Sequence, residues 1–167
     1  MLALTGGVRG TDSIELFQSP AVTGNGIYTL EFYVRSLCHL PRAKVDNIET
    51  LNKGDKLFLM KDDQNSFEAL ALAVRTDTPA WFVGYCPKYY AEDLSVLLAN
   101  KNSGLEVHVK CVNVDAPLNM RLLCSVTATV PSVFSPLGNA NDFQPIISED
   151  PDEWQQLTVS LEGAPRA

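Results

Sequence analysis

Apolar and polar residues alternate in several short stretches of this chain, a pattern that predicts half-buried β-strands. Between residues 27 and 37, for example, apolar side chains occupy every second position at Tyr28, Leu30, Phe32 and Val34. The same reasoning predicts strands over residues 12–17, 27–37, 56–60, 69–75, 81–85, 105–114 and 120–130. The pattern therefore indicates a mainly β protein, either a small antiparallel barrel or a sharply twisted sheet.

Two of these strands carry a further signal. Residues 56–60 are too apolar for a solvent-facing strand, so we expect this strand to lie centrally in the sheet. The alternation of residues 105–114 slips near Cys111 and Val112, which predicts a β-bulge there.

The spacing of the apolar residues changes after Pro87, where we expect the clearest helix. Proline suits the first turn of a helix, and Tyr90, Leu94 and Leu97 follow at helical spacing on one face. Glu92 and Asp93 fall early in this helix, where its dipole favours acidic side chains. A second, shorter helix is expected to open at Pro41, with apolar residues at positions 45, 48 and 51.

The domain organisation follows from where the pattern begins and fades. We expect an N-terminal extension with one short strand over residues 1–27 and a β domain over residues 28–130. Residues 131–167 are rich in proline, asparagine and acids, and are expected to form an irregular acidic C-terminal tail.

Composition favours a soluble, cytoplasmic protein. The mean hydropathy is −0.01, and the chain has neither an apolar run of membrane length nor the basic and apolar start of a signal peptide. The four cysteines form no CxxC pair, so we expect buried free thiols and no structural metal. GxGxxG, P-loop and HExxH motifs are absent, so we expect no catalytic activity, and we also expect no cofactor.

The net charge of −7 is distributed unevenly along the chain. Residues 131–167 hold six acids and one base, whereas residues 1–130 hold fourteen acids and twelve bases. Six of the thirteen bases fall between Arg35 and Lys61. The body is thus nearly neutral with one mildly basic region, which excludes a broad phosphate-binding footprint but leaves room for a small anionic site.

Two corners of the chain hold the residues most suited to binding. Asn65-Ser66-Phe67-Glu68 forms a loop between strands, and Tyr85-Cys86-Pro87-Lys88 joins a strand to the long helix. Loops held by a rigid scaffold often carry binding residues, and here an aromatic ring, a carboxylate and an ammonium group could converge.

The order of these motifs resembles that of the HIRAN domain family. Asn65-Ser66-Phe67-Glu68 followed by an Ala-Leu-Ala-Val run is similar to the family's Asn-Pro-Tyr-Asp segment and its strand. Val83-Gly84-Tyr85-x-Pro87-Lys88 and the upstream Ser36-Leu37-Cys38-His39 step also resemble family motifs, and the resemblance spans roughly residues 28–130. The Thr-Gly-Gly start and Phe143-Gln144-Pro145 resemble bacterial stand-alone HIRAN proteins. The resemblance implies an OB-like β-barrel of about six strands with two helices.

The resemblance also implies a pocket for the 3′ end of single-stranded DNA. In this chain Phe67 would stack on the terminal base, and Glu68 would accept a hydrogen bond from the 3′-hydroxyl. His39 and Tyr85 would line the pocket, and Lys88 would contact phosphate.

Two further bases complete the expected nucleic-acid-binding set. Arg35 and Lys61 would add positive charge around the Phe67 loop. Cys38 stands where the family has an arginine, and Arg35 would face the opposite side from Cys38 if the strand alternation continued that far. Ser66, Phe67 and Glu68 replace the family's proline, tyrosine and aspartate.

Each binding residue also has an ordinary structural interpretation. Phe67 could cap the core, Glu68 could pair with Lys88, and His39 could be a turn residue. The resemblance favours a non-catalytic module that binds single-stranded DNA or its 3′ end. The alternative is a protein-interaction domain that kept the barrel but lost the DNA pocket, and a weaker alternative is an enzyme acting on nucleic acid. The expected partners are single-stranded DNA ends and a helicase, ATPase or other DNA-processing protein, with no membrane.

Overall fold

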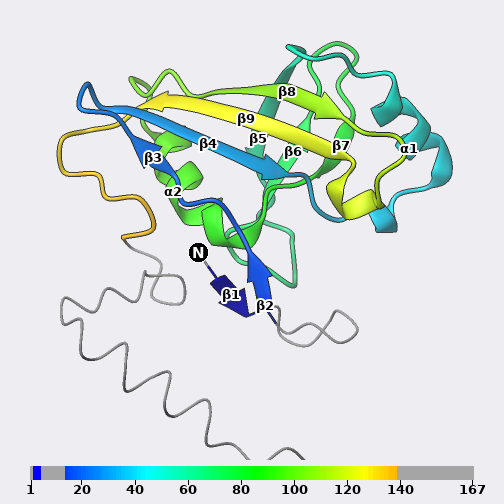
Figure 1. Ribbon diagram of the computed structural model, residues 1–167, viewed down its shortest axis with the longest axis horizontal. Helices are drawn as coiled ribbons and strands as arrows, with labels where there is room; N and C mark the ends of the chain where they lie inside the picture. The colour runs from blue at the N-terminus through cyan, green and yellow to red at the C-terminus, as the bar shows by residue number, and fades with distance from the viewer. Residues whose placement is uncertain (1, 5–13, 139–167) are drawn as a thin grey trace, which may run out of the picture.

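A computed structural model describes residues 2–4 and 14–138, which form one curled, mainly antiparallel β structure with two α-helices (Figure 1). Within these residues seven strands are hydrogen-bonded in the order β3-β4-β9-β8-β5-β6-β7, and β1 pairs with β2 in a small second sheet. The strands are β1 Leu2–Leu4, β2 Ile14–Leu16, β3 Ala21–Val22, β4 Ile27–Tyr33, β5 Lys56–Lys61, β6 Leu72–Arg75, β7 Phe82–Tyr85, β8 Glu106–Val112 and β9 Leu122–Thr129. The helices are α1 Arg42–Glu49 and α2 Lys88–Ala99, with 3₁₀ turns at Leu37–His39 and Leu118–Met120.

The predicted mainly β fold class with two helices is confirmed, and the main sheet has seven antiparallel strands instead of about six. β5 lies between β8 and β6, so its central position is also confirmed. The register of β8 on β9 shifts between Val109 and Cys111, next to the predicted bulge. The sequence pattern did not predict β1 or the two-residue β3.

β4 ends sooner than its alternation predicted. Ser36 has a left-handed backbone with φ of 67°, and the chain then turns through Leu37–His39. A single isolated bridge follows β4, in which Arg35 N donates to Tyr85 O at 2.8 Å and Tyr85 N donates to Arg35 O at 3.1 Å. This bridge joins the two sides of the curled sheet at one point, without a continuous ladder between β4 and β7.

Gly84 allows that close approach. A Cβ atom at this position would lie 2.5 Å from Val34 Cγ1 and 2.6 Å from the Arg35 carbonyl oxygen. Any side chain would therefore push β7 away from the end of β4 and separate the Arg35–Tyr85 bridge.

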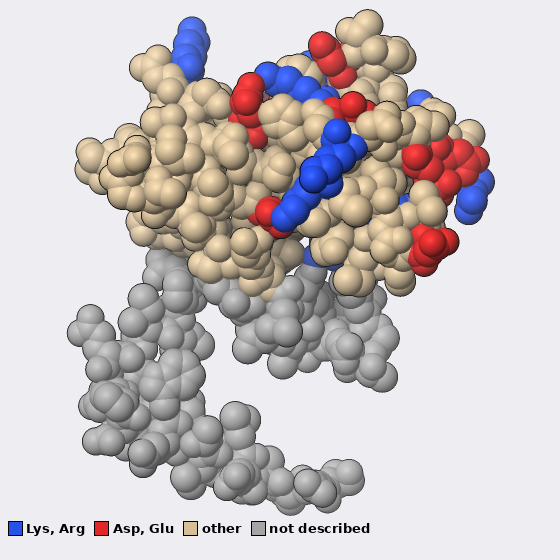
Figure 2. Space-filling view, turned by 45° about the horizontal axis from the view of Figure 1, so that its top comes forward, with Lys and Arg blue, Asp and Glu red and all other residues tan. Residues whose placement is uncertain are grey.

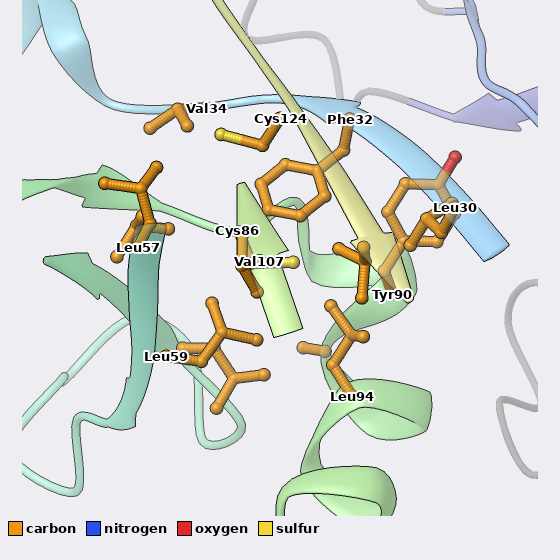
Figure 3. Packing of buried hydrophobic residues seen from close by; sticks show 14 of the residues in the cluster. Leu30, Phe32, Val34, Leu57, Leu59, Cys86, Tyr90, Leu94, Val107 and Cys124 are labelled. Atoms are coloured by element: carbon orange, nitrogen blue, oxygen red, sulfur yellow. The ribbon is translucent and has the colours of Figure 1, made fainter. Parts of the chain in front are cut away.

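Helix α2 packs its predicted apolar stripe into the interior of the sheet. Tyr90, Leu94 and Leu97 are buried, and Figure 3 shows Tyr90 and Leu94 facing side chains from β4, β5, β8 and β9. The helix dipole was predicted to explain the position of Asp93, and the structure gives a different explanation. Its carboxylate is only 3% exposed and accepts hydrogen bonds from the Leu137 N–H (3.0 Å to each oxygen) and the Tyr28 hydroxyl (3.4 Å). Asp93 thus stabilises the end of the described chain against α2.

The cysteine prediction is half right. All four are free, and Cys86 and Cys124 are buried, but Cys38 and Cys111 are exposed. Cys38 lies in the 3₁₀ turn after β4, and Cys111 lies on the bulged part of β8, so neither points into the core. Burial raises the pKa of the Cys124 thiol to about 12 and also raises that of Cys86.

The remaining expectations concern the ends of the chain. The acidic tail expected after Pro131 lies outside the described residues from position 139 onward, as do residues 5–13 of the N-terminal extension. Neither described helix has the length and apolar character needed to cross a bilayer.

Candidate nucleic-acid interface

A pocket of about 1060 Å³ lies where the Arg35–Tyr85 bridge joins the sheet. Three separate segments line it: the turn after β4, the loop between β5 and β6, and the corner from β7 into α2. Six of the seven predicted binding residues are in its wall, namely Arg35, His39, Phe67, Glu68, Tyr85 and Lys88. Lys61, the seventh, is exposed at the end of β5 and does not line the pocket. Cys38 is also absent from the lining, although Arg35 and His39 are present on either side of it.

The loop that carries Phe67 and Glu68 is shaped by two side chains ahead of them. Asn65 Oδ1 accepts hydrogen bonds from the backbone N–H of Phe67 (2.9 Å) and of Glu68 (3.0 Å). Asp62 Oδ1 accepts the Gln64 N–H at 3.3 Å. Such bonds hold a loop backbone in a defined turn. The Phe67 ring is left 97% exposed, so it does not cap the core.

Tyr85 faces this loop across the pocket. Its hydroxyl donates to Asp62 Oδ2 at 2.6 Å, and its ring packs edge-on against Phe82, with ring centroids 5.0 Å apart. The hydrogen bond to Asp62 raises the pKa of Tyr85, with smaller contributions from burial and from the carboxylate charge. Asp62 was not among the predicted binding residues. Its position directly after a strand, before the Phe67 loop, is the sequence signal that could have identified it.

Arg35 is held at the pocket by both its backbone and its side chain. The bridge to Tyr85 fixes the backbone, and guanidinium Nη2 donates to the Tyr89 hydroxyl at 3.0 Å. Tyr89 itself is buried behind the pocket wall, at 7% exposure. A guanidinium has five N–H donors in a fixed fork, a geometry that suits phosphate oxygens.

The start of helix α2 forms the remaining wall. Pro87, Lys88 and Ala91 line the pocket, and Pro87 supplies no side-chain cap to the helix. The amide groups in the first turn of a helix carry partial positive charge and favour anions. Lys88 adds an ammonium group at the same place.

The pocket charges nevertheless balance. Arg35 and Lys88 contribute two positive charges, and Asp62 and Glu68 contribute two negative charges, with His39 beside them. The face shown in Figure 2 likewise has basic and acidic side chains interspersed over a mostly uncharged surface. Some exposed bases outside the pocket form ion pairs, as in the 2.9 Å contact of Lys56 with Glu106, which lowers the pKa of Glu106. This distribution suits a local site better than a long charged groove.

The described residues contain no cluster of three or more histidine, cysteine or acidic side chains arranged to hold a metal ion. The pocket lining combines aromatic rings, carboxylates and the cations of Arg35 and Lys88.

The comparisons with known proteins identify the family. A family model of the HIRAN domain matches residues 27–131, more than half of the chain. The chain belongs to the HIRAN domain family. Among solved structures, it is similar to the crystal structure of the HIRAN domain of human HLTF, with a TM-score of 0.46 and 18% sequence identity over 64% of this chain and 81% of that chain. No curated protein matched the chain.

Proposed function

We propose that this HIRAN-domain chain is a non-catalytic module that binds single-stranded DNA and recognises its 3′ end. The observation that supports this proposal is the meeting of three distant chain segments at one pocket, which combines an exposed ring with carboxylates and cations. The role of each residue is assigned from its chemistry and its place in the pocket.

Phe67 supplies a stacking surface at the pocket. Stacking of a base on an aromatic side chain contributes about 1–3 kcal/mol and tolerates any base. Because the ring is 97% exposed, a base can cover it without displacing core side chains. Tyr85 provides a second aromatic group in the same pocket.

The polar groups divide into two roles. Arg35, Lys88 and the first turn of α2 bind phosphate, while Glu68 accepts the hydrogen bond of a terminal hydroxyl. A carboxylate accepts a hydrogen bond from a hydroxyl but repels a terminal phosphate. The site therefore selects a free 3′-hydroxyl end.

The proposal is tested by fluorescence anisotropy with one labelled single strand bearing either a 3′-hydroxyl or a 3′-phosphate. The hydroxyl-ended strand should bind more tightly, and the same strand closed into a circle should bind weakly. Equal binding to all three strands, or no binding, would reject end recognition.

Variants of the pocket refine the test. Phe67→Ala should weaken binding by about tenfold, which is the equivalent of losing one stacked base. Met120→Ala is the matched control, because Met120 is also an exposed apolar residue but lies outside the pocket lining. An equal loss in both variants would show that the Phe67 ring has no special role.

The contribution of a positive charge to DNA binding is tested by removing one lysine near each end of α2. Lys88→Ala should reduce the affinity and lower the salt dependence by about one phosphate contact. Lys101→Ala removes the same charge just beyond the other end of the helix and should change neither quantity. Because the pocket is neutral overall, we expect modest affinity with a clear salt dependence.

The balanced pocket charge also favours a second candidate, a protein-interaction domain. A pocket with two acids and two bases suits a peptide of mixed charge, and the exposed Phe67 could anchor it. The partner would be a helicase, ATPase or other DNA-processing protein in the cytoplasm. A pull-down with the intact chain that recovers only nucleic acid would count against this candidate.

A further inference from the structure

We propose that Tyr89, supported by Phe17, is a positioning residue that orients the Arg35 guanidinium for phosphate, so that the binding unit extends beyond the HIRAN match into the N-terminal segment. The inference rests on the proposed function, because it assigns how one cation of that pocket is held. Neither Phe17 nor Tyr89 lines the pocket.

Tyr89 is in direct contact with the side chain of Arg35. An arginine side chain has many rotamers, and fixing it costs conformational entropy. Here guanidinium Nη2 donates to the Tyr89 hydroxyl at 3.0 Å, while the backbone of Arg35 is paired in both directions with Tyr85. The guanidinium is thus oriented before any ligand arrives, which reduces the entropy lost on binding.

Aromatic side chains support the ring of Tyr89 in turn. Its ring stacks on Phe17, with ring centroids 4.2 Å apart and planes inclined by 25°. It also packs edge-on against Tyr90, at 4.6 Å between centroids. Phe17 is 8% exposed and packs edge-on against Tyr90 as well, at 5.7 Å. The hydroxyl of Tyr89 is therefore aimed from a rigid aromatic cluster.

The segment that supplies Phe17 is anchored to helix α2. The Tyr90 hydroxyl donates to the Gln18 carbonyl oxygen at 2.6 Å, so two neighbouring residues of α2 hold residues 17 and 18. The HIRAN match begins at residue 27. A ring that precedes the matched span by ten positions is thus connected to the pocket through Tyr89 and Arg35.

The test is a double-mutant cycle on the full chain, measured as the affinity for a 3′-hydroxyl single strand. Arg35→Gln should weaken binding by about tenfold, as expected for a lost hydrogen bond to a charged group. Tyr89→Phe keeps the ring and its stacking but removes the acceptor, and should weaken binding by about threefold. In the Arg35→Gln background, Tyr89→Phe should cause no further loss, because the group that it orients is absent.

Two more variants separate orientation from general destabilisation. Phe17→Leu keeps an apolar side chain but removes the stacked ring, and should weaken binding in the wild-type background only. Tyr28→Phe removes another tyrosine hydroxyl, one that donates to Asp93 outside the pocket lining, and should lower the melting temperature without changing the affinity.

The outcomes are distinguishable. Wild-type binding that Arg35→Gln weakens but Tyr89→Phe leaves unchanged would overturn this inference and leave the proposed function standing. Equal losses from Tyr89→Phe in both backgrounds would also overturn it, since a purely structural effect is additive. Absence of DNA binding by the wild-type chain would overturn the proposed function and this inference together.

Discussion

Two tyrosine–carboxylate pairs occur in different regions of this molecule. At the pocket, Tyr85 donates to Asp62 at 2.6 Å, and both side chains are only partly buried. In the interior, Tyr28 donates to Asp93 at 3.4 Å, with Tyr28 fully buried and Asp93 only 3% exposed. The chemical groups are the same, but their surroundings differ.

The tyrosine pKa values reflect this difference. Both are raised, but the principal cause for Tyr85 is its hydrogen bond to Asp62, whereas for Tyr28 it is burial. The pair at the pocket is accessible to water and ligand, so it can exchange its hydrogen bond with a bound molecule. The buried pair cannot do so without unfolding, which makes it a structural element.

The largest expected contrast is in stability. Asp93→Ala leaves two buried donors, the Leu137 N–H and the Tyr28 hydroxyl, without their acceptor and should cost about 3 kcal/mol of unfolding free energy. Asp62→Ala removes a partly exposed acceptor that water can replace, and should cost about 1 kcal/mol or less. Urea denaturation of both variants measures this contrast, and equal costs would show that the two pairs do not differ in role.

A substitution at Gly84 should disturb the backbone bridge that positions Tyr85, and with it the Tyr85–Asp62 pair. In Gly84→Ala the new Cβ meets Val34 Cγ1 and the Arg35 carbonyl, so the variant should lose about 2 kcal/mol of stability and also bind DNA less tightly. Gly24→Ala is the control, because a Cβ there meets no atom within 4 Å. Unchanged DNA affinity in a destabilised Gly84→Ala chain would separate the bridge from the site.

The cause assigned to the Tyr85 pKa can be tested directly. Asp62→Asn should lower the pKa of Tyr85 towards its ordinary value of 10.0. The sign for stability follows from the raised pKa. The folded state retains the Tyr85 proton above pH 10, so the stability that Tyr85 contributes is lost as the pH rises through its folded pKa. NMR titration of ring-labelled tyrosine measures the pKa of Tyr85 in both chains, and an equal value in wild type and Asp62→Asn would contradict the assignment.

The sequence predicted the regular elements well because their signals are local. The alternation in β4 and the helical spacing of Tyr90, Leu94 and Leu97 depend only on neighbouring positions, and both correspond to buried faces in the structure. The end of β4 was predicted too late, because the left-handed turn at Ser36 has no marker such as glycine in the sequence.

The candidate site shows where such local signals become insufficient. Resemblance to the family selected Phe67 and Glu68, but Asp62 was not selected, because its partner Tyr85 lies 23 positions away along the chain. The role of Asp93 depends on Tyr28 and Leu137, at separations of 65 and 44 positions. Contacts of this kind are decided by tertiary packing, which no periodicity records.

The smallest expected effect concerns the pH dependence of the buried pair. Burial raises the pKa of Asp93 above its ordinary value of 3.8, against the opposing effects of the Leu137 N–H and the Tyr28 hydroxyl. The folded state then binds the Asp93 proton more tightly than the unfolded state does. Its contribution to stability is therefore present in full below pH 3.8 and is lost as the pH rises through the folded pKa.

Asp93→Asn removes this titration while keeping an acceptor for the Leu137 N–H. The difference in unfolding free energy between wild type and Asp93→Asn should decline as the pH rises from 3.8. Denaturation series at several pH values give this curve. A difference that grows with pH would mean that the two hydrogen bonds to Asp93 outweigh its burial, and the charged carboxylate would then be the form that the interior stabilises.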